Sequence, residues 1–264
     1  MDIWKTKKNL DLDKHCRGQI GPLILWFLRQ FDEIHIAIKR LGDELVEDDV
    51  VSFASTDENQ QEGLDWKRWV VGEKSNTISI LPIMPDRPVV VRPDVPVRIP
   101  TGLEAIFFVG IPVWVKVVVG DSDTFDLCEQ PTVIRSNTWF GDPMSGELCY
   151  SLTTRARREI LEAEIEPHRC ICPVKICNSS PVTLEVDKLC IHVAHLKIFE
   201  GTKQLWTNEV TITFKGEDMA SEIYYSQKEP GYEPINAVLS EARTPFRKTI
   251  LKKSLGSFKL FTGI

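Results

Sequence analysis

Short runs of β-branched and aromatic residues, broken by glycine, proline and aspartate, recur along this chain and restrict the fold that it can adopt. The clearest run is 210–214, where Val210, Ile212 and Phe214 alternate with polar residues. Alternation with a period of two places one side of a strand in a core and the other side in solvent. The pattern therefore predicts an all-β protein.

The same criteria predict strands along most of the chain, at 23–29, 34–39, 66–71, 77–84, 104–119, 133–140, 148–152, 169–177, 182–186, 189–193, 210–214 and 223–226. The first two predict a hairpin, and the runs 66–71 and 77–84 predict another pair of strands. Six prolines lie between positions 82 and 100. Because proline lacks the amide donor of a central strand, we expect this segment at a sheet edge or between sheets.

One segment favours a helix and divides the chain. Residues 153–164 (TTRARREILEAE) are rich in charges and precede Pro167, which predicts a short connector helix. Short, regularly spaced strands follow, as is typical of sandwich domains. We therefore predict two β-sandwich domains, a β-rich N-terminal domain over 1–155 and an immunoglobulin-like domain over 166–264 that ends in a basic tail.

The tail differs in charge from the rest of the protein. Residues 240–264 hold six Lys or Arg and one acid, although the net charge of the chain is −6. Apolar residues recur there at near-helical spacing, at positions 246, 250, 251, 255 and 258. A helical C-terminal tail of this kind packs on its own acidic body or lies on an anionic membrane surface. We favour packing on the body, and the negative total charge argues against nucleic acid as a partner.

Cysteine usage and the apolar stretches predict a cytoplasmic protein. The start, Met1 to Asp13, is polar, and the seven cysteines lie mostly within apolar runs. Reduced thiols in a cytoplasm are the simplest interpretation. The stretches 20–28 and 106–119 are short or interrupted, whereas a membrane-spanning helix needs roughly 20 continuous apolar residues.

A group of cysteines and histidines offers ligands that zinc prefers, namely His168, Cys170, Cys172, Cys177, Cys190, His192 and His195. Strand parity places Cys170 and Cys172 on a core face. The same reasoning places Cys190 and His192 opposite Leu189, on an outward face. Because ligand pairs on opposite faces do not easily meet, we expect buried cysteines of the apolar kind and no cofactor.

Catalytic motifs are absent from the sequence. It contains no Gly-x-Ser-x-Gly elbow, no phosphate-binding glycine loop and no His-Glu-x-x-His helix. We therefore predict no catalytic residue. A metal-binding protein or enzyme that uses His168, Cys170, Cys172, Cys190 and His192, with zinc as the metal, stays an alternative.

Several segments carry a resemblance to a known family. The stretch 136–143 (SNTWFGDP), continued by 146–152 (GELCYSL) and 154–157 (TRAR), resembles the prokaryotic domain-of-unknown-function family DUF432. Segments 22–39, 82–114 and 172–191 fit the same resemblance. It covers most of the chain and implies a soluble archaeal or bacterial protein, with no activity to transfer.

The loop within this signature is the candidate binding site. Trp139, Phe140, Gly141, Asp142 and Pro143 form an aromatic-flanked turn between two predicted strands, which favours a recognition surface. The alternative is a buried tryptophan beneath a tight turn. The leading prediction is a non-catalytic binding or assembly protein of the prokaryotic cytoplasm, whose partner is another protein, a small molecule or a second copy of the chain. The second alternative function is membrane-surface association through residues 240–264.

Overall fold

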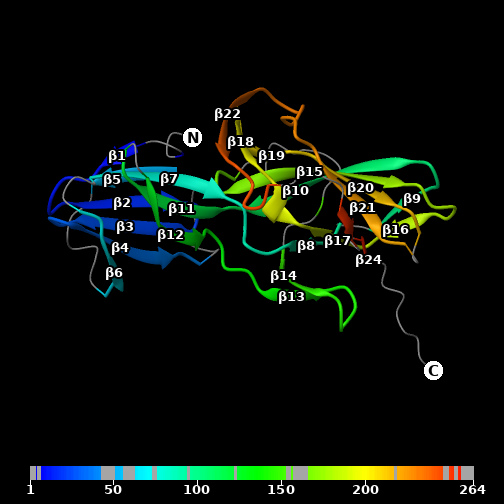
Figure 1. Ribbon diagram of the computed structural model, residues 1–264, viewed down its shortest axis with the longest axis horizontal. Coiled ribbons are helices and arrows are strands. Elements are labelled where there is room, and N and C mark those ends of the chain that lie inside the picture. Colours follow the sequence, from blue (N-terminus) through cyan, green and yellow to red (C-terminus); the bar gives the residue numbers. More distant parts are fainter. Residues whose placement is uncertain are drawn as a thin grey trace. The chain divides into compact units, whose positions relative to one another are not determined.

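The computed structural model of the protein is all-β, as predicted (Figure 1). It describes residues 4, 7–42, 51–55, 63–72, 76–93, 96–121, 124–152, 156, 166–216, 219–245, 250–252 and 255–256. The chain divides into two compact units. Unit 1 comprises Met1–Ile83, Pro112–Ile134 and Glu166–His168, and unit 2 comprises Met84–Ile111, Arg135–Ile165 and Arg169–Ile264. Each unit is thus discontinuous in sequence, whereas the predicted domains, 1–155 and 166–264, are contiguous.

Unit 1 contains two antiparallel sheets. The four-stranded sheet has the order β1-β7-β11-β12, with strands β1 (Lys7–Asn9), β7 (Thr77–Ile83), β11 (Trp114–Val119) and β12 (Phe125–Pro131). The five-stranded sheet has the order β5-β2-β3-β4-β6, with strands β2 (His15–Ile20), β3 (Leu23–Arg29), β4 (Glu33–Arg40), β5 (Val51–Ser55) and β6 (Trp66–Val70).

Strand pairing in unit 1 confirms one sequence prediction and corrects another. The predicted early hairpin exists, because β3 pairs with β4 from Leu23↔Arg40 to Arg29↔Ile34. The predicted pairing of 66–71 with 77–84 is wrong, since β6 pairs with β4, and β7 pairs with β1 and β11. Arg40 joins the two sheets by donating from Nε to the carbonyl oxygen of Pro131 at 3.0 Å.

Unit 2 is built on an eight-stranded sheet. Its order is β22-β18-β19-β15-β20-β21-β23, and β10 also pairs with β15. The strands are β10 (Glu104–Pro112), β15 (Arg169–Asn178), β18 (Ile198–Gly201), β19 (Leu205–Thr207), β20 (Val210–Phe214), β21 (Ser221–Tyr225), β22 (Ile235–Ser240) and β23 (Ile250–Lys252). In β20 the predicted alternation is confirmed, because Val210, Ile212 and Phe214 are buried and the residues between them are half-buried.

Two smaller sheets complete unit 2. The five-stranded sheet has the order β13-β14-β8-β17-β24, with strands β8 (Val89–Val91), β13 (Asn137–Phe140), β14 (Glu147–Ser151), β17 (Lys188–Ile191) and β24 (Leu255–Gly256). The strands β9 (Val97–Ile99) and β16 (Leu184–Val186) form a two-stranded sheet, and a short 3₁₀ helix, η4, spans Val193–His195.

The predicted helical tail is wrong for the tail residues that the structure describes. Ile250–Lys252 form β23, which pairs with β21, and Leu255–Gly256 form β24, which pairs with β17. The tail residues form strands because they hydrogen-bond to β21 and β17, at the edges of two sheets. Gly256 is also a poor helix former. The segments 246–249, 253–254 and 257–264 lie outside the described residues, as does nearly all of the connector helix predicted at 153–164. The one described residue of that segment, Ala156, forms a β-bridge to Pro93.

Candidate functional site

One face of the five-stranded sheet gathers the polar and sulfur-bearing side chains. Cross-strand partners share a sheet face, and Phe140 lies opposite Glu147 while Cys190 lies opposite Val90. Cys149 is two residues beyond Glu147 on β14 and therefore shares its face. Val90, Phe140, Cys149 and Cys190 pack together as a buried cluster. This face is therefore a small core with chemically active members.

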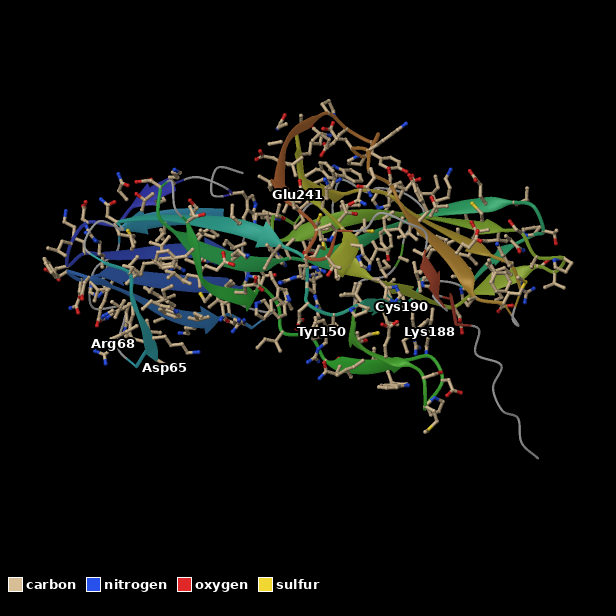
Figure 2. All side chains as sticks on the ribbon, viewed as in Figure 1. Asp65, Arg68, Tyr150, Lys188, Cys190 and Glu241 are labelled. Atoms are coloured by element: carbon tan, nitrogen blue, oxygen red, sulfur yellow. The ribbon has the colours of Figure 1, made fainter. Side chains whose placement is uncertain are left out.

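Three of these side chains converge, and the sulfur of Cys149 adjoins one of them. The ligand atoms of Glu147, Cys190 and His192 all lie within 4.8 Å of one another. His192 Nε2 is 2.6 Å from Glu147 Oε1, and Cys149 Sγ is 3.9 Å from Cys190 Sγ. Cys149 is 0% exposed and Cys190 1%, whereas the side chain of Glu147 is 29% exposed. The cluster is thus closed on the sulfur side and reaches water through Glu147; Figure 2 labels Cys190 on this sheet.

A tyrosine of the neighbouring sheet lies beside this cluster. Burial raises the pKa of Tyr225 far above its ordinary value, and the nearby thiols of Cys172 and Cys190 and the carboxyl of Glu147 raise it further. The ring of His195 packs against Tyr225, with centroids 5.1 Å apart. The phenol therefore stays protonated at neutral pH, in a setting where additional negative charge is costly.

The predicted Cys/His group is only partly brought together. Cys190 and His192 belong to the cluster, but His168 belongs to unit 1, where its Nε2 is 3.2 Å from Glu166. The ring of His168 packs directly on Gly21, where an added Cβ would lie 2.4 Å from Nδ1. His168 therefore has a structural contact of its own within unit 1.

Cys170 and Cys172 lie on β15, in the eight-stranded sheet, and both are fully buried. Burial raises the pKa of Cys170 well above its ordinary value and that of Cys172 to about 12, although a hydrogen bond with Thr207 lowers the latter. Burial also raises the pKa of Cys177. These thiols therefore remain protonated at neutral pH, as expected for cysteines of a core.

The prediction that Cys190 and His192 face outward is wrong. Both residues are buried, at 1% and 6% exposure, and so are Leu189 and Ile191, which lie on the opposite face. Strand parity correctly separates the two faces of β17, but both faces are covered. The argument that kept Cys190 and His192 from a shared site therefore fails for this pair.

The opposite face of the β13–β14 hairpin is apolar and exposed. Trp139 lies directly opposite Leu148, and their exposed fractions are 51% and 42%. Met144, in the turn between the strands, is 93% exposed. The interpretation of Trp139 as a buried tryptophan is therefore wrong, and large apolar surface of this kind is typical of a contact surface.

The predicted loop Trp139–Pro143 holds the indole in place. Gly141 has a φ of +100°, a left-handed conformation that favours glycine. The carbonyl oxygen of Asp142 accepts hydrogen bonds from Trp139 Nε1 at 3.0 Å and from the Gly146 amide at 2.6 Å. An added Cβ at Gly146 would lie 2.5 Å from both Phe140 O and Trp139 Nε1. Trp139 is thus a fixed side chain, while Phe140 faces the core.

Polar groups border the apolar surface. Tyr150 lies opposite Asn137, and its hydroxyl donates to Asp86 at 2.9 Å. The Arg87 guanidinium lies 5.5 Å from the centre of the Tyr150 ring and donates to Asn137 Oδ1 at 3.1 Å. Burial and the Asp86 carboxylate raise the pKa of Tyr150. Figure 2 labels Tyr150. A polar border around exposed aromatic surface resembles the rim of an interface.

Sequence reasoning missed Glu147 and Cys149 as members of the cluster. They are separated from Cys190 by about forty residues, and the Cys149–Cys190 contact has a sequence separation of 41. Cys149 lies within the predicted strand 148–152, whereas Glu147 precedes it; β14 begins one residue earlier, which places both on one face. Their partner across β8 is set by the strand order β14-β8-β17, for which the sequence has no local signal.

The fold and the cluster define an all-β protein of two compact units, one of which contains a buried Glu/Cys/His group. Residues 8–260 match the family described as "Protein of unknown function (DUF432)", and the chain belongs to this family. No curated protein and no solved structure matches the chain. Among the described residues, none of the helices is long and apolar enough to cross a membrane.

Proposed function

We propose that this chain is a non-catalytic binding and assembly protein of the prokaryotic cytoplasm, and that two copies meet through the β13–β14 hairpin. The observation that carries the proposal is the exposed cross-strand pair of Trp139 and Leu148. Aromatic side chains held rigidly at a surface supply much of the binding energy of protein interfaces at little entropic cost. Cys149, Cys170, Cys172 and Cys190 are buried, and the use of cysteine as a small apolar core residue supports a reducing compartment.

The backbone of β13 supports association as well. β13 pairs with β14 on one side, and no other strand of the described residues pairs with it on the other. The amide of Ser151 donates to Ser136 O, so residues 136, 138 and 140 direct their backbone groups toward β14. Asn137 and Trp139 consequently direct theirs outward, where an added strand could pair with them.

A second copy of the same chain is the occupant that this edge fits best. The four residues of β13, NTWF, carry no charge, although natural sheet edges are commonly protected by charged residues. Across a two-fold axis each residue lies close to its own copy, where a charge would be repelled. An axis through Trp139 would place the two indoles side by side and continue the apolar strip to Leu148 of both copies.

Sedimentation velocity tests this proposal. Because one hairpin buries less area than a standard interface, we expect weak dimerisation, with a dissociation constant on the order of 10 µM. Asn137→Pro removes an outward-facing amide while leaving the groups that pair with β14. It should therefore shift the chain to monomer. Wild-type protein that stays monomeric at roughly 200 µM would contradict the proposal.

Membrane-surface association through residues 240–264 stays the second alternative. The described tail residues 250–252 and 255–256 form strands, so an amphipathic helix at those positions does not support it.

A further inference from the structure

We propose that Cys149, Cys190, His192 and Glu147 form a binding site for a thiophilic divalent metal ion, zinc above all. The four side chains come from β14 and from the end of β17, on either side of β8. Two sulfurs, an imidazole and a carboxylate are a ligand set that suits tetrahedral zinc. The inference is independent of dimerisation, since these side chains lie on the opposite face of the sheet from Trp139 and Leu148.

The distance between the sulfurs agrees with shared coordination. Two thiolates bound to one zinc ion at about 2.3 Å, at a tetrahedral angle, lie about 3.8 Å apart. The Cys149 and Cys190 sulfurs are 3.9 Å apart. The pair therefore has close to the spacing that one ion requires.

The Glu147–His192 contact completes the site. At 2.6 Å the carboxylate and the imidazole share a hydrogen bond, and the Glu147 oxygen is within 4.8 Å of the Cys190 sulfur. A bound cation would replace the shared proton and the two thiol protons, so that metal uptake releases protons. The divalent charge would also compensate for placing thiolates in this buried region, where negative charge is otherwise costly.

Burial indicates a structural centre. Cys190 is 1% and His192 6% exposed, so that little space is left for a substrate, and structural zinc sites are closed in this way. A metal here would link β14 to the chain after β17 across β8, and would therefore stabilise the five-stranded sheet.

Metal analysis of untagged protein purified under reducing conditions tests the site. We expect about one zinc per chain, and we expect Co²⁺ to bind with thiolate charge-transfer absorption and the visible bands of tetrahedral coordination. Cys190→Ser should abolish the charge-transfer band or weaken it severely. Cys170→Ser is the matched control, because Cys170 is an equally buried thiol on β15 and should leave metal binding unchanged.

Glu147→Gln provides a variant of nearly the same shape that tests the site even where Cys190→Ser fails to fold. It should weaken Co²⁺ affinity by about 10–100-fold. Folded wild-type protein that binds no stoichiometric zinc or cobalt would overturn the inference. Metal affinity that is unchanged in Glu147→Gln, or lowered equally by the Cys170 and Cys190 substitutions, would overturn it as well.

Discussion

Replacing Trp139 by serine should separate the proposed dimer without unfolding the protein. The indole is 51% exposed, and a tryptophan side chain covers up to about 250 Å², so about 125 Å² is available to a partner. At about 25 cal/mol per Å² this corresponds to about 3 kcal/mol per copy when fully covered. A two-fold contact contains two such residues. Even if each indole is only partly covered, we expect the substitution to cost about 2.7 kcal/mol of binding free energy in total, which raises the dissociation constant about 100-fold.

Sedimentation velocity measures this change directly. Wild-type protein should sediment faster as its concentration rises, and Trp139→Ser should sediment as a monomer throughout the same range. Phe31→Ser is a matched control, since Phe31 is an exposed aromatic residue of unit 1, at 64% exposure. It should behave as wild type. The reasoning is refuted if Trp139→Ser associates as strongly as the wild type does.

Three further predictions concern stability and the binding loop. Gly146→Ala should weaken dimerisation by at least about tenfold, because the added Cβ meets Phe140 O and Trp139 Nε1 at 2.5 Å and displaces the indole; sedimentation equal to wild type would contradict this. Asn178→Ala should lower the free energy of urea unfolding by about 2–4 kcal/mol, since the amide donates to the carbonyl oxygens of Ile99 and Val182, both at 2.8 Å, and its oxygen accepts from the amide and hydroxyl of Ser180, so that all four hydrogen bonds are lost; a loss below about 1 kcal/mol would count against it. Finally, burial raises the pKa of Cys172 from 9.0 to about 12, so the folded chain holds a proton that the unfolded chain releases. Stability from this group is complete below pH 9 and is lost as pH rises toward 12, by up to about 1.4 kcal/mol per pH unit. Cys172→Ala should therefore show a shallower alkaline decline in urea unfolding than wild type, and equal slopes would contradict the prediction.

Local sequence patterns were sufficient to predict strands that are short apolar runs bounded by turn residues. The run 23–29 corresponds to β3 and the run 210–214 to β20, because each is a short run of aliphatic and aromatic residues with clear turn signals at its ends. The proline-rich segment 82–100 was harder. It was expected at an edge or between sheets, yet β8 lies between β14 and β17. Pro88 and Pro93 flank the three valines of β8 from outside, so that no ladder donor is lost.

Long-range arrangement is what the sequence could not supply. The helix predicted for the tail followed from apolar spacing alone, but pairing of β23 with β21 gives those residues backbone partners that spacing does not reveal. The cluster shows the same limit. Strand parity correctly predicted that Cys190 and Leu189 lie on opposite faces of their strand. It could not predict that both faces are buried, or that Glu147 lies beside His192.

Hydrogen–deuterium exchange of the Trp139 amide tests the proposed interface most directly, because this amide faces away from β14, on the side where no strand of the described residues pairs with β13. Its protection should rise with protein concentration, in parallel with the dimer fraction, whereas the Thr138 amide, which faces β14, should stay equally protected throughout. Dimer formation with no change in exchange at Trp139 would contradict the account.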